Sequence, residues 1–292
     1  MRRARELRAI LSELPGYRNG PYADIRKWVL AELDATRVRG RVVHRDSIAV
    51  AREGAAQIAL VGMPNAGKSS LLQALSNVQI KTGDYAFTTT RPVPALTRVC
   101  GVLVQLVEIP GLLVGAASDD RGGGRALLSV LRAADAMLLC HSAREPVRSL
   151  ESLRNELAGA GIELPTLLAI TKVDEMLDDA VAELVSASDL ETVPVSVLDD
   201  RTLETLEVAL FRLTGLVRIS LRHNGEDDEH PLALRPPVCV LDVARVIHKE
   251  LGESCRGARV WGPSARFDAQ RVGREHRLAD GDIVEILVRR RI

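Results

Sequence analysis

Short apolar runs alternate with helical stretches through the middle of the chain. The runs are Ile58–Val61, Val102–Ile109, Ala136–Cys140, Thr166–Ile170 and Thr192–Val195, and the helix candidates between them include Ser69–Ala74 and Glu151–Ala158. Strands that alternate with helices indicate a mainly parallel sheet with helices on both faces. Residues 56–222 are therefore expected to form one α/β domain.

The segments on either side of this domain have different patterns. In residues 1–55, apolar residues recur at helical spacing between Pro and Gly breaks, which predicts a small helical unit. A polar bridge, Asn224–His230, leads into residues 225–292, where a helical pattern is combined with two strands, Arg259–Trp261 and Ile283–Val288. That combination predicts a small α+β module.

Composition indicates the class of protein and the distribution of its charge. Hydrophobic residues make up 46% and charged residues 27% of the 292 residues, as in folded soluble proteins, and the formal net charge is +0. A balanced charge gives no global field that would attract nucleic acid or a membrane. Residues 1–55, however, hold 12 Lys and Arg against 7 Asp and Glu. This part either faces a polyanion or is a solvated helix surface.

The chain has no feature of a secreted or membrane protein. No apolar run approaches the roughly 18 residues that a membrane span needs, and the N-terminus lacks the apolar stretch of a secretory signal. The four cysteines are dispersed without metal-ligand spacing. We expect a cytoplasmic protein with no membrane partner, and the sequence leaves its oligomeric state open.

The first apolar run of the α/β domain is followed at once by the pattern GxxxxGK[ST]. It comprises Gly62, Met63, Pro64, Asn65, Ala66, Gly67, Lys68 and Ser69, with Ser70 next. The glycines let the loop curl so that backbone N–H groups point at phosphate oxygens. Lys68 neutralises the β- and γ-phosphates, the Ser69 hydroxyl ligates Mg²⁺, and the helix that follows directs its positive end at the phosphates. A strand before and a helix after favour a nucleotide-binding loop over an ordinary Gly-rich turn.

Two later segments fit loops that sense the nucleotide. Phe87, Thr88 and Thr89 lie in a polar stretch, where a hydroxyl can complete the Mg²⁺ shell only when the γ-phosphate is present. The backbone N–H of Gly111 can meet the γ-phosphate, and Glu108, three residues earlier, can hold the metal through water.

A guanine-reading motif follows the fourth apolar run. The carboxylate of Asp174 can accept from N1–H and the 2-amino group of guanine, which adenine does not offer, and a buried carboxylate left unpaired is costly. Lys172, after Thr171, can lie along the base plane. Ser196 and Val197 follow a later strand and can close over the base. Asp174 therefore favours GTP and argues against an ATP-binding relative.

In this order, the motifs resemble those of the Obg and DRG (developmentally regulated GTP-binding) branch of GTPases. The match runs through VGMPNAGKSSLLQALSN, GDYAFTTTRPVPA and IPGLLVGAASDDRGGG, and continues in DVARVIHKELGE and ARVWGPSARFDAQRVG, which resemble a TGS domain. The resemblance implies a P-loop GTPase that uses GTP/GDP and Mg²⁺. It also implies a C-terminal TGS domain of β-grasp, ubiquitin-like fold that is linked to RNA and ribosome contacts.

The same resemblance implies roles for single residues. Ser69 and Thr89 would ligate Mg²⁺, and Gly111 would sense the γ-phosphate. The catalytic set would be Asn65, Lys68, Thr89 and Gly111. Asn65 matches an asparagine that helps to hold K⁺ in K⁺-stimulated relatives, where the ion stabilises transition-state charge. The alternative is that Asn65 only shapes the loop.

The chain departs from the family pattern at several points. Glu108 stands where the family has Asp, and Thr171 stands where Asn is usual. Leu112 and Leu113 occupy the place where many small GTPases have a water-orienting Gln, although the Obg-like branch is also apolar there. The spacing from Gly111 to Lys172 is too short for the subdomain that DRG proteins carry inside the GTPase domain.

These observations leave two functional hypotheses. One is a slow GTPase switch that docks on the ribosome or another RNA. The other is a nucleotide-binding interaction module that barely hydrolyses GTP, because the longer side chain of Glu108 displaces the metal contact. The tail Arg289-Arg290-Arg291 either binds RNA phosphates or is solvated.

Overall fold

The computed structural model describes residues 50–76, 91–110 and 124–288. The helical unit expected at residues 1–55 lies almost wholly outside the described residues. So do four residues expected at the nucleotide, which are Phe87, Thr88, Thr89 and Gly111.

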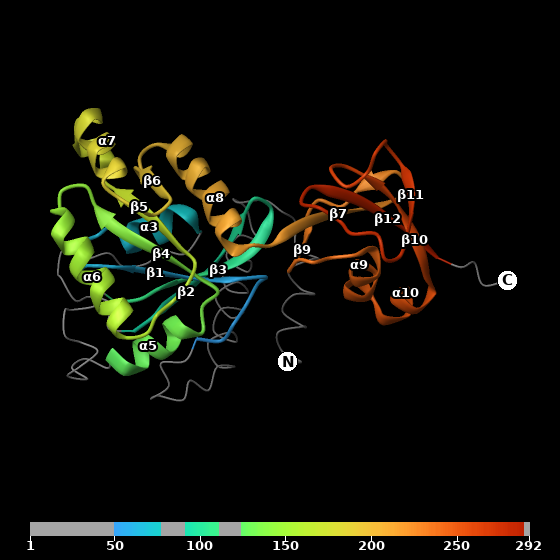
Figure 1. Ribbon diagram of the computed structural model, residues 1–292, viewed down its shortest axis with the longest axis horizontal. Coiled ribbons are helices and arrows are strands. Elements are labelled where there is room, and N and C mark those ends of the chain that lie inside the picture. Colours follow the sequence, from blue (N-terminus) through green and yellow to red (C-terminus); the bar gives the residue numbers. More distant parts are fainter. Residues whose placement is uncertain (1–49, 77–90, 111–123, 289–292) are drawn as a thin grey trace, which may run out of the picture. The chain divides into compact units, whose positions relative to one another are not determined.

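A six-stranded sheet forms the centre of the expected α/β domain (Figure 1). Its order is β2-β3-β1-β4-β5-β6, with only β2 antiparallel to its neighbour β3. The strands are β1 (Gln57–Gly62), β2 (Val93–Val99), β3 (Val102–Glu108), β4 (Ala136–Ser142), β5 (Thr166–Thr171) and β6 (Thr192–Val195). The prediction of a mainly parallel sheet is confirmed, and β2 is a strand that the sequence analysis did not name.

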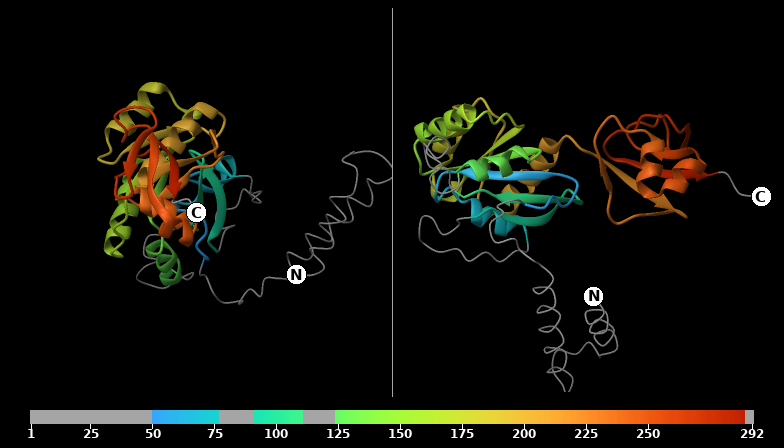
Figure 2. Two further views of the ribbon diagram at one scale, coloured as in Figure 1. Left: turned by 90° about the vertical axis from the view of Figure 1, so that its right-hand side faces the viewer. Right: turned by 90° about the horizontal axis from the view of Figure 1, so that it is seen from below.

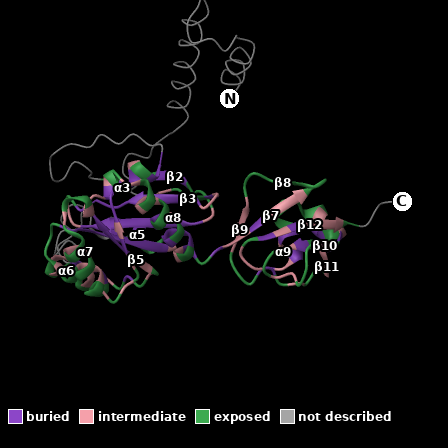
Figure 3. Cartoon of the chain, turned by 90° about the horizontal axis from the view of Figure 1, so that it is seen from above, coloured by how far each residue is buried: buried purple, intermediate pink, exposed green. Residues whose placement is uncertain are grey.

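Helices cover both faces of this sheet because its central strands are apolar on both sides. In β1, Ile58 and Leu60 enter one core cluster and Ala59 and Val61 the other, as side chains of a strand alternate. The first cluster includes α3 (Lys68–Leu75) and α8 (Asp200–Thr214), and the second includes α5 (Gly124–Arg132) and α6 (Val147–Gly159) with α7 (Asp178–Ser186) at its margin. Figure 3 shows the resulting band of buried strands between helices with exposed outer faces.

A second, mixed sheet forms the C-terminal module. Its order is β11-β10-β12-β7-β8, β9 pairs with β7, and only the β12–β7 pair is parallel. The elements are β7 (Val217–His223), β8 (Glu226–Asp227), β9 (Leu232–Leu234), α9 (Val240–Ile247), α10 (Lys249–Ser254), β10 (Cys255–Trp261), β11 (Gln270–Gly273) and β12 (Asp282–Val288). The helices lie against one face of the sheet, as the orange and red module in Figure 2 shows. The prediction of a small α+β module is confirmed.

Two details of this module differ from the sequence expectation. Strand β7 belongs to the second sheet, whereas the expected boundary put residues 217–222 with the first domain. The sequence also has an apolar run, Val238–Leu241, ahead of the helical pattern, but the helix already begins at Val240. The carboxylate of Asp242 accepts from the Cys239 backbone N–H at 2.9 Å, which caps the helix. Within the described residues, no helix is long and apolar enough to cross a bilayer.

Candidate functional site: a phosphate loop and a base-reading loop

The carboxyl ends of the parallel strands bring the motif residues to one edge of the first sheet. β1 ends at Gly62, β3 at Glu108 and β5 at Thr171. In the register of the sheet, Leu60 lies opposite Glu108 and Ser142 lies opposite Thr171. This edge is where open α/β sheets bind their ligands.

The loop between β1 and α3 has a backbone suited to an anion. Asn65 and Gly67 both adopt positive φ angles, 64° and 78°, which curl the loop. Helix α3 has no side-chain cap at Gly67 and no acid in its first turn. Its first N–H groups therefore face the loop without competition, as in helix N-termini that bind phosphate. The φ of Asn65 supports a loop-shaping role for this residue, since Asn tolerates the left-handed region.

Lys68 is buried within this loop, with 6% of its surface exposed. Its ammonium donates to the carbonyl oxygens of Gly62 at 3.1 Å and Met63 at 2.9 Å. Burial lowers the pKa of Lys68, although the nearby Cys140 and Glu108 oppose that shift. A buried, desolvated cation is electrostatically costly, so the fold holds the charge where an anionic ligand would relieve it.

Gly62 is required by a close backbone approach that the sequence analysis missed. A Cβ at this position would lie 2.4 Å from the carbonyl oxygen of Cys140 and 3.2 Å from Ala66 Cβ. No sequence signal reveals this contact with Cys140, because its partner is a main-chain atom of another strand.

Gly62→Ala is accordingly expected to destabilise the protein by about 2 kcal/mol, since β1 and β4 must separate. Urea unfolding of the nucleotide-free protein measures this loss. Gly159→Ala, in α6, is the matched control, because a Cβ there meets nothing within 4 Å. That control should be neutral or stabilising. Equal stability of Gly62→Ala and wild type would contradict the close approach.

Two side chains tie the loop after β5, the candidate base-reading loop, to the phosphate loop. The Thr171 hydroxyl lies 3.0 Å from the carbonyl oxygen of Ala66 and 3.3 Å from that of His141. The Lys172 ammonium donates to the Asn65 carbonyl oxygen at 2.9 Å. Thr171 therefore makes loop-tethering contacts at a position where the family has Asn, and Lys172 extends along the phosphate loop.

The remaining candidate base-reading residues follow β5 and β6. Asp174 lies in a short 3-10 helix, Val173–Glu175, and is exposed. Among the described residues, no segment covers Asp174. The cost of an unpaired carboxylate would apply only once a base lies over it. Ser196 is buried, and its hydroxyl accepts from the Leu198 N–H at 3.1 Å, while Val197 is exposed.

Ser69 and Glu108 form the candidate metal site. The Ser69 hydroxyl donates to Glu108 Oε1 at 2.6 Å. Glu108 is buried, with 2% of its surface exposed, and its Oε2 has no hydrogen-bond partner among the described residues. An unsatisfied buried carboxylate oxygen costs about 1–3 kcal/mol or more. A hydroxyl and a carboxylate oxygen are ligands that Mg²⁺ prefers, so these two residues fit that ion.

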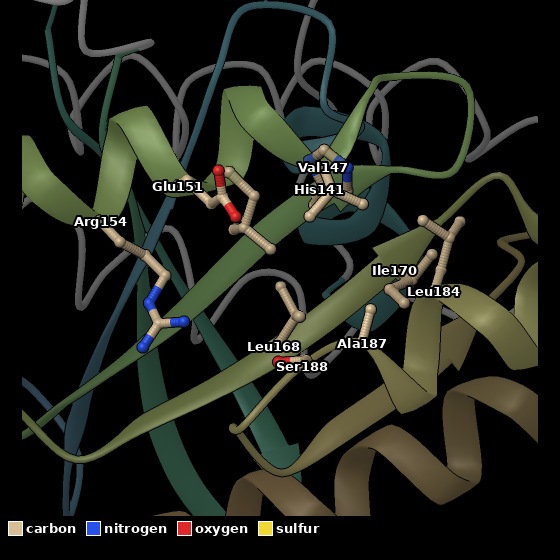
Figure 4. A pocket seen from close by; sticks show the side chains of 10 residues that line it. His141, Val147, Glu151, Arg154, Leu168, Ile170, Leu184, Ala187 and Ser188 are labelled. Atoms are coloured by element: carbon tan, nitrogen blue, oxygen red, sulfur yellow. The ribbon is translucent and has the colours of Figure 1, made fainter.

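A pocket elsewhere in this domain does not fit a nucleotide (Figure 4). It lies between α6, α7 and β5, with His141, Glu151 and Arg154 among its lining residues. Its volume of about 50 Å³ is far below the roughly 300 Å³ at which ligand pockets begin. His141 is buried, its Nε2 lies 3.1 Å from the Glu145 carbonyl oxygen, and burial lowers its pKa. These are features of a structural histidine.

Comparisons with known proteins agree with this geometry. A family model described as a 50S ribosome-binding GTPase matches residues 57–172, and a TGS domain model matches residues 217–288. The chain is 28% identical to a GTP-binding protein of Methanocaldococcus jannaschii, with 86% of this chain and 83% of that protein covered. It is also 28% identical to ribosome-interacting GTPase 1 of Saccharomyces cerevisiae, with 82% and 84% covered.

A third relative is developmentally-regulated GTP-binding protein 1 of Xenopus laevis, 26% identical over 82% of this chain and 84% of that protein. The alignment with the archaeal relative spans 326 positions, more than the 292 residues of this chain. That relative therefore carries additional residues inside the aligned region.

Proposed function

The chain belongs to the DRG/Obg type of P-loop GTPases with a C-terminal TGS domain, and from this we propose that it is a slow GTP-hydrolysing switch that docks on the ribosome. The observation that carries the proposal is the phosphate loop, in which the uncapped start of α3 and the buried ammonium of Lys68 meet beside Ser69 and Glu108. The alternative remains a nucleotide-binding interaction module with little turnover. Both functions fit a cytoplasmic protein.

In the proposed reaction, the chain acts by positioning and by electrostatics. Backbone N–H groups at the start of α3 and the ammonium of Lys68 hold the phosphates while charge moves toward the leaving oxygen. Ser69 and Glu108 would hold Mg²⁺, which supplies Lewis-acid stabilisation of the developing charge. Gly111 and Thr89 would complete the γ-phosphate site. Leu112 and Leu113 offer no polar group to orient the attacking water, which supports a slow reaction.

Turnover and its salt dependence test the first half of the proposal. Phosphate release from GTP with Mg²⁺ is expected to be faster in KCl than in NaCl at equal ionic strength, if the Asn65 side chain helps to hold K⁺. Asn65→Gly keeps the positive φ accessible and removes only the side chain, so it should abolish the difference between the salts. Asn224→Gly is the matched control, because Asn224 also has a positive φ, 52°, outside the site.

The outcomes separate the hypotheses. An undiminished KCl effect in Asn65→Gly would assign Asn65 to loop shaping alone. An absence of turnover in both salts, with GTP still bound, would favour the interaction module.

The exposed face of the second sheet supports a ribosomal or RNA partner. Arg259 lies opposite Arg271 on one side and Glu285 on the other, and Trp261 is two residues further along β10. The Arg222 guanidinium lies 4.4 Å from the centre of the Trp261 ring. The other face carries the buried residues that pack on α9. Arginines next to an aromatic ring suit phosphate contact and base stacking.

Co-sedimentation with ribosomes tests this second half. With a non-hydrolysable GTP analogue present, the double variant Arg259→Ala/Arg271→Ala should bind more weakly and should show a salt slope smaller by about 2 than wild type. Arg148→Ala/Arg201→Ala removes two exposed arginines from the first domain and serves as the control. Equal loss in both double variants would argue against the TGS face as the contact.

A further inference from the structure

Glu108 holds a carboxylate oxygen that no described residue satisfies. It ends β3, is almost fully buried, and uses only Oε1, which accepts from the Ser69 hydroxyl. The neighbouring cation, the Lys68 ammonium, donates instead to the carbonyl oxygens of Gly62 and Met63. Within the described residues, the second oxygen of Glu108 therefore has no hydrogen-bond partner, while the first contacts the hydroxyl that would bind a metal ion.

The spacing of the two side chains matches adjacent ligands of one small cation. Mg²⁺ binds oxygens at about 2.0–2.1 Å in octahedral geometry, so adjacent ligand oxygens lie about 2.9 Å apart. Ser69 Oγ and Glu108 Oε1 are 2.6 Å apart. A small opening of this contact would admit the ion to both oxygens.

The extra methylene of Glu108 determines whether its carboxylate contacts the metal directly or through a water molecule. The carboxylate of an aspartate at the end of β3 would lie farther from Ser69 and the metal by roughly one carbon–carbon bond, about 1.5 Å. That interval leaves room for a water molecule between carboxylate and metal. Glutamate removes most of it, because its carboxylate already contacts the hydroxyl that ligates the ion.

We propose, on the basis of the nucleotide-binding function proposed above, that Glu108 is a direct ligand of the divalent cation and takes the place of one of its water molecules. Ser69, Glu108 and a phosphate oxygen of GDP then occupy three of the six ligand positions of the ion. An added anionic ligand binds the ion more tightly and leaves fewer exchangeable waters on it.

The number of waters on the metal tests this assignment. Mn²⁺ substitutes for Mg²⁺ in the complex of the full chain with GDP, and its electron paramagnetic resonance lines broaden in ¹⁷O-enriched water in proportion to the bound waters. Wild type should show about three, the positions that Ser69, Glu108 and phosphate leave open in a six-coordinate ion. Glu108→Asp should show one more, and its complex should bind Mn²⁺ about tenfold more weakly.

Glu163→Asp shortens an exposed glutamate outside the site and should leave the wild-type count unchanged. About four waters in wild type, or equal counts in wild type and Glu108→Asp, would overturn direct coordination while leaving the nucleotide site intact. The wild-type count decides the matter even if Glu108→Asp does not fold. Failure of wild type to bind GDP with Mn²⁺ would overturn the proposed function itself, and direct coordination with it.

Discussion

Lys68→Met is expected to raise the dissociation constant for GDP at least about 100-fold, or roughly 2.8 kcal/mol. Charge-assisted hydrogen bonds to phosphate contribute on the order of 1.5–3 kcal/mol. Here the ammonium is already buried between the carbonyls of Gly62 and Met63, so it moves little to meet the ligand. Calorimetric titration with GDP and Mg²⁺ measures the loss.

The same substitution should change the stability of the nucleotide-free protein far less. Methionine removes the buried ammonium of Lys68, whose pKa is lowered by burial. Relief of this desolvation cost offsets the loss of the two hydrogen bonds. We expect a change in the free energy of unfolding within about 1 kcal/mol. Lys249→Met, at an exposed lysine of the second domain, is the control for removing one positive charge. An unchanged dissociation constant for GDP in Lys68→Met would rule out that Lys68 binds the phosphates.

Asp174→Asn is the second change with a large expected effect. It replaces one of the two carboxylate oxygens that would accept hydrogen bonds from guanine with an amino group, which donates. Affinity for GDP should fall at least about 100-fold, while xanthosine diphosphate, which offers an acceptor in place of the 2-amino group, should become the preferred ligand. Competition between the two diphosphates for a fluorescent nucleotide measures the preference.

Because Asp174 is exposed, its substitution should leave the free energy of unfolding within about 0.5 kcal/mol of wild type. Specificity can thus be separated from folding at this position. Asp178→Asn replaces another exposed aspartate nearby and should change neither property. An unaltered preference for GDP in Asp174→Asn would remove the basis for guanine selection by this residue.

The features that the sequence predicted well depend on residues close together in the chain. The phosphate loop is such a case, since β1, the loop and α3 are contiguous and each has its own pattern. The parallel sheet followed from the alternation of apolar runs and helices. Strand β7 could not be assigned to a sheet in the same way, because its place depends on pairing with later strands, among them β12, which is more than 50 residues away.

The sequence proposes members for the candidate site but does not indicate the contacts between them. The sequence identified Glu108 as a departure from the family pattern, but its contact with Ser69 joins residues 39 positions apart. It also identified Thr171 as a departure, without indicating that the Thr171 hydroxyl contacts the carbonyl oxygens of Ala66 and His141. The exposure of Asp174 in the nucleotide-free chain is a further feature that the sequence did not indicate.

The ties from Thr171 and Lys172 to the phosphate loop have a thermodynamic consequence. They fix the separation between the part of the site that would bind the base and the part that would bind the phosphates. When a ligand that carries a base and phosphates at that separation has bound by one end, its other end meets a loop that is already held in place. The association constant of GDP, divided by the product of the association constants of guanosine and pyrophosphate, is an effective molarity, and we expect this ratio to be high.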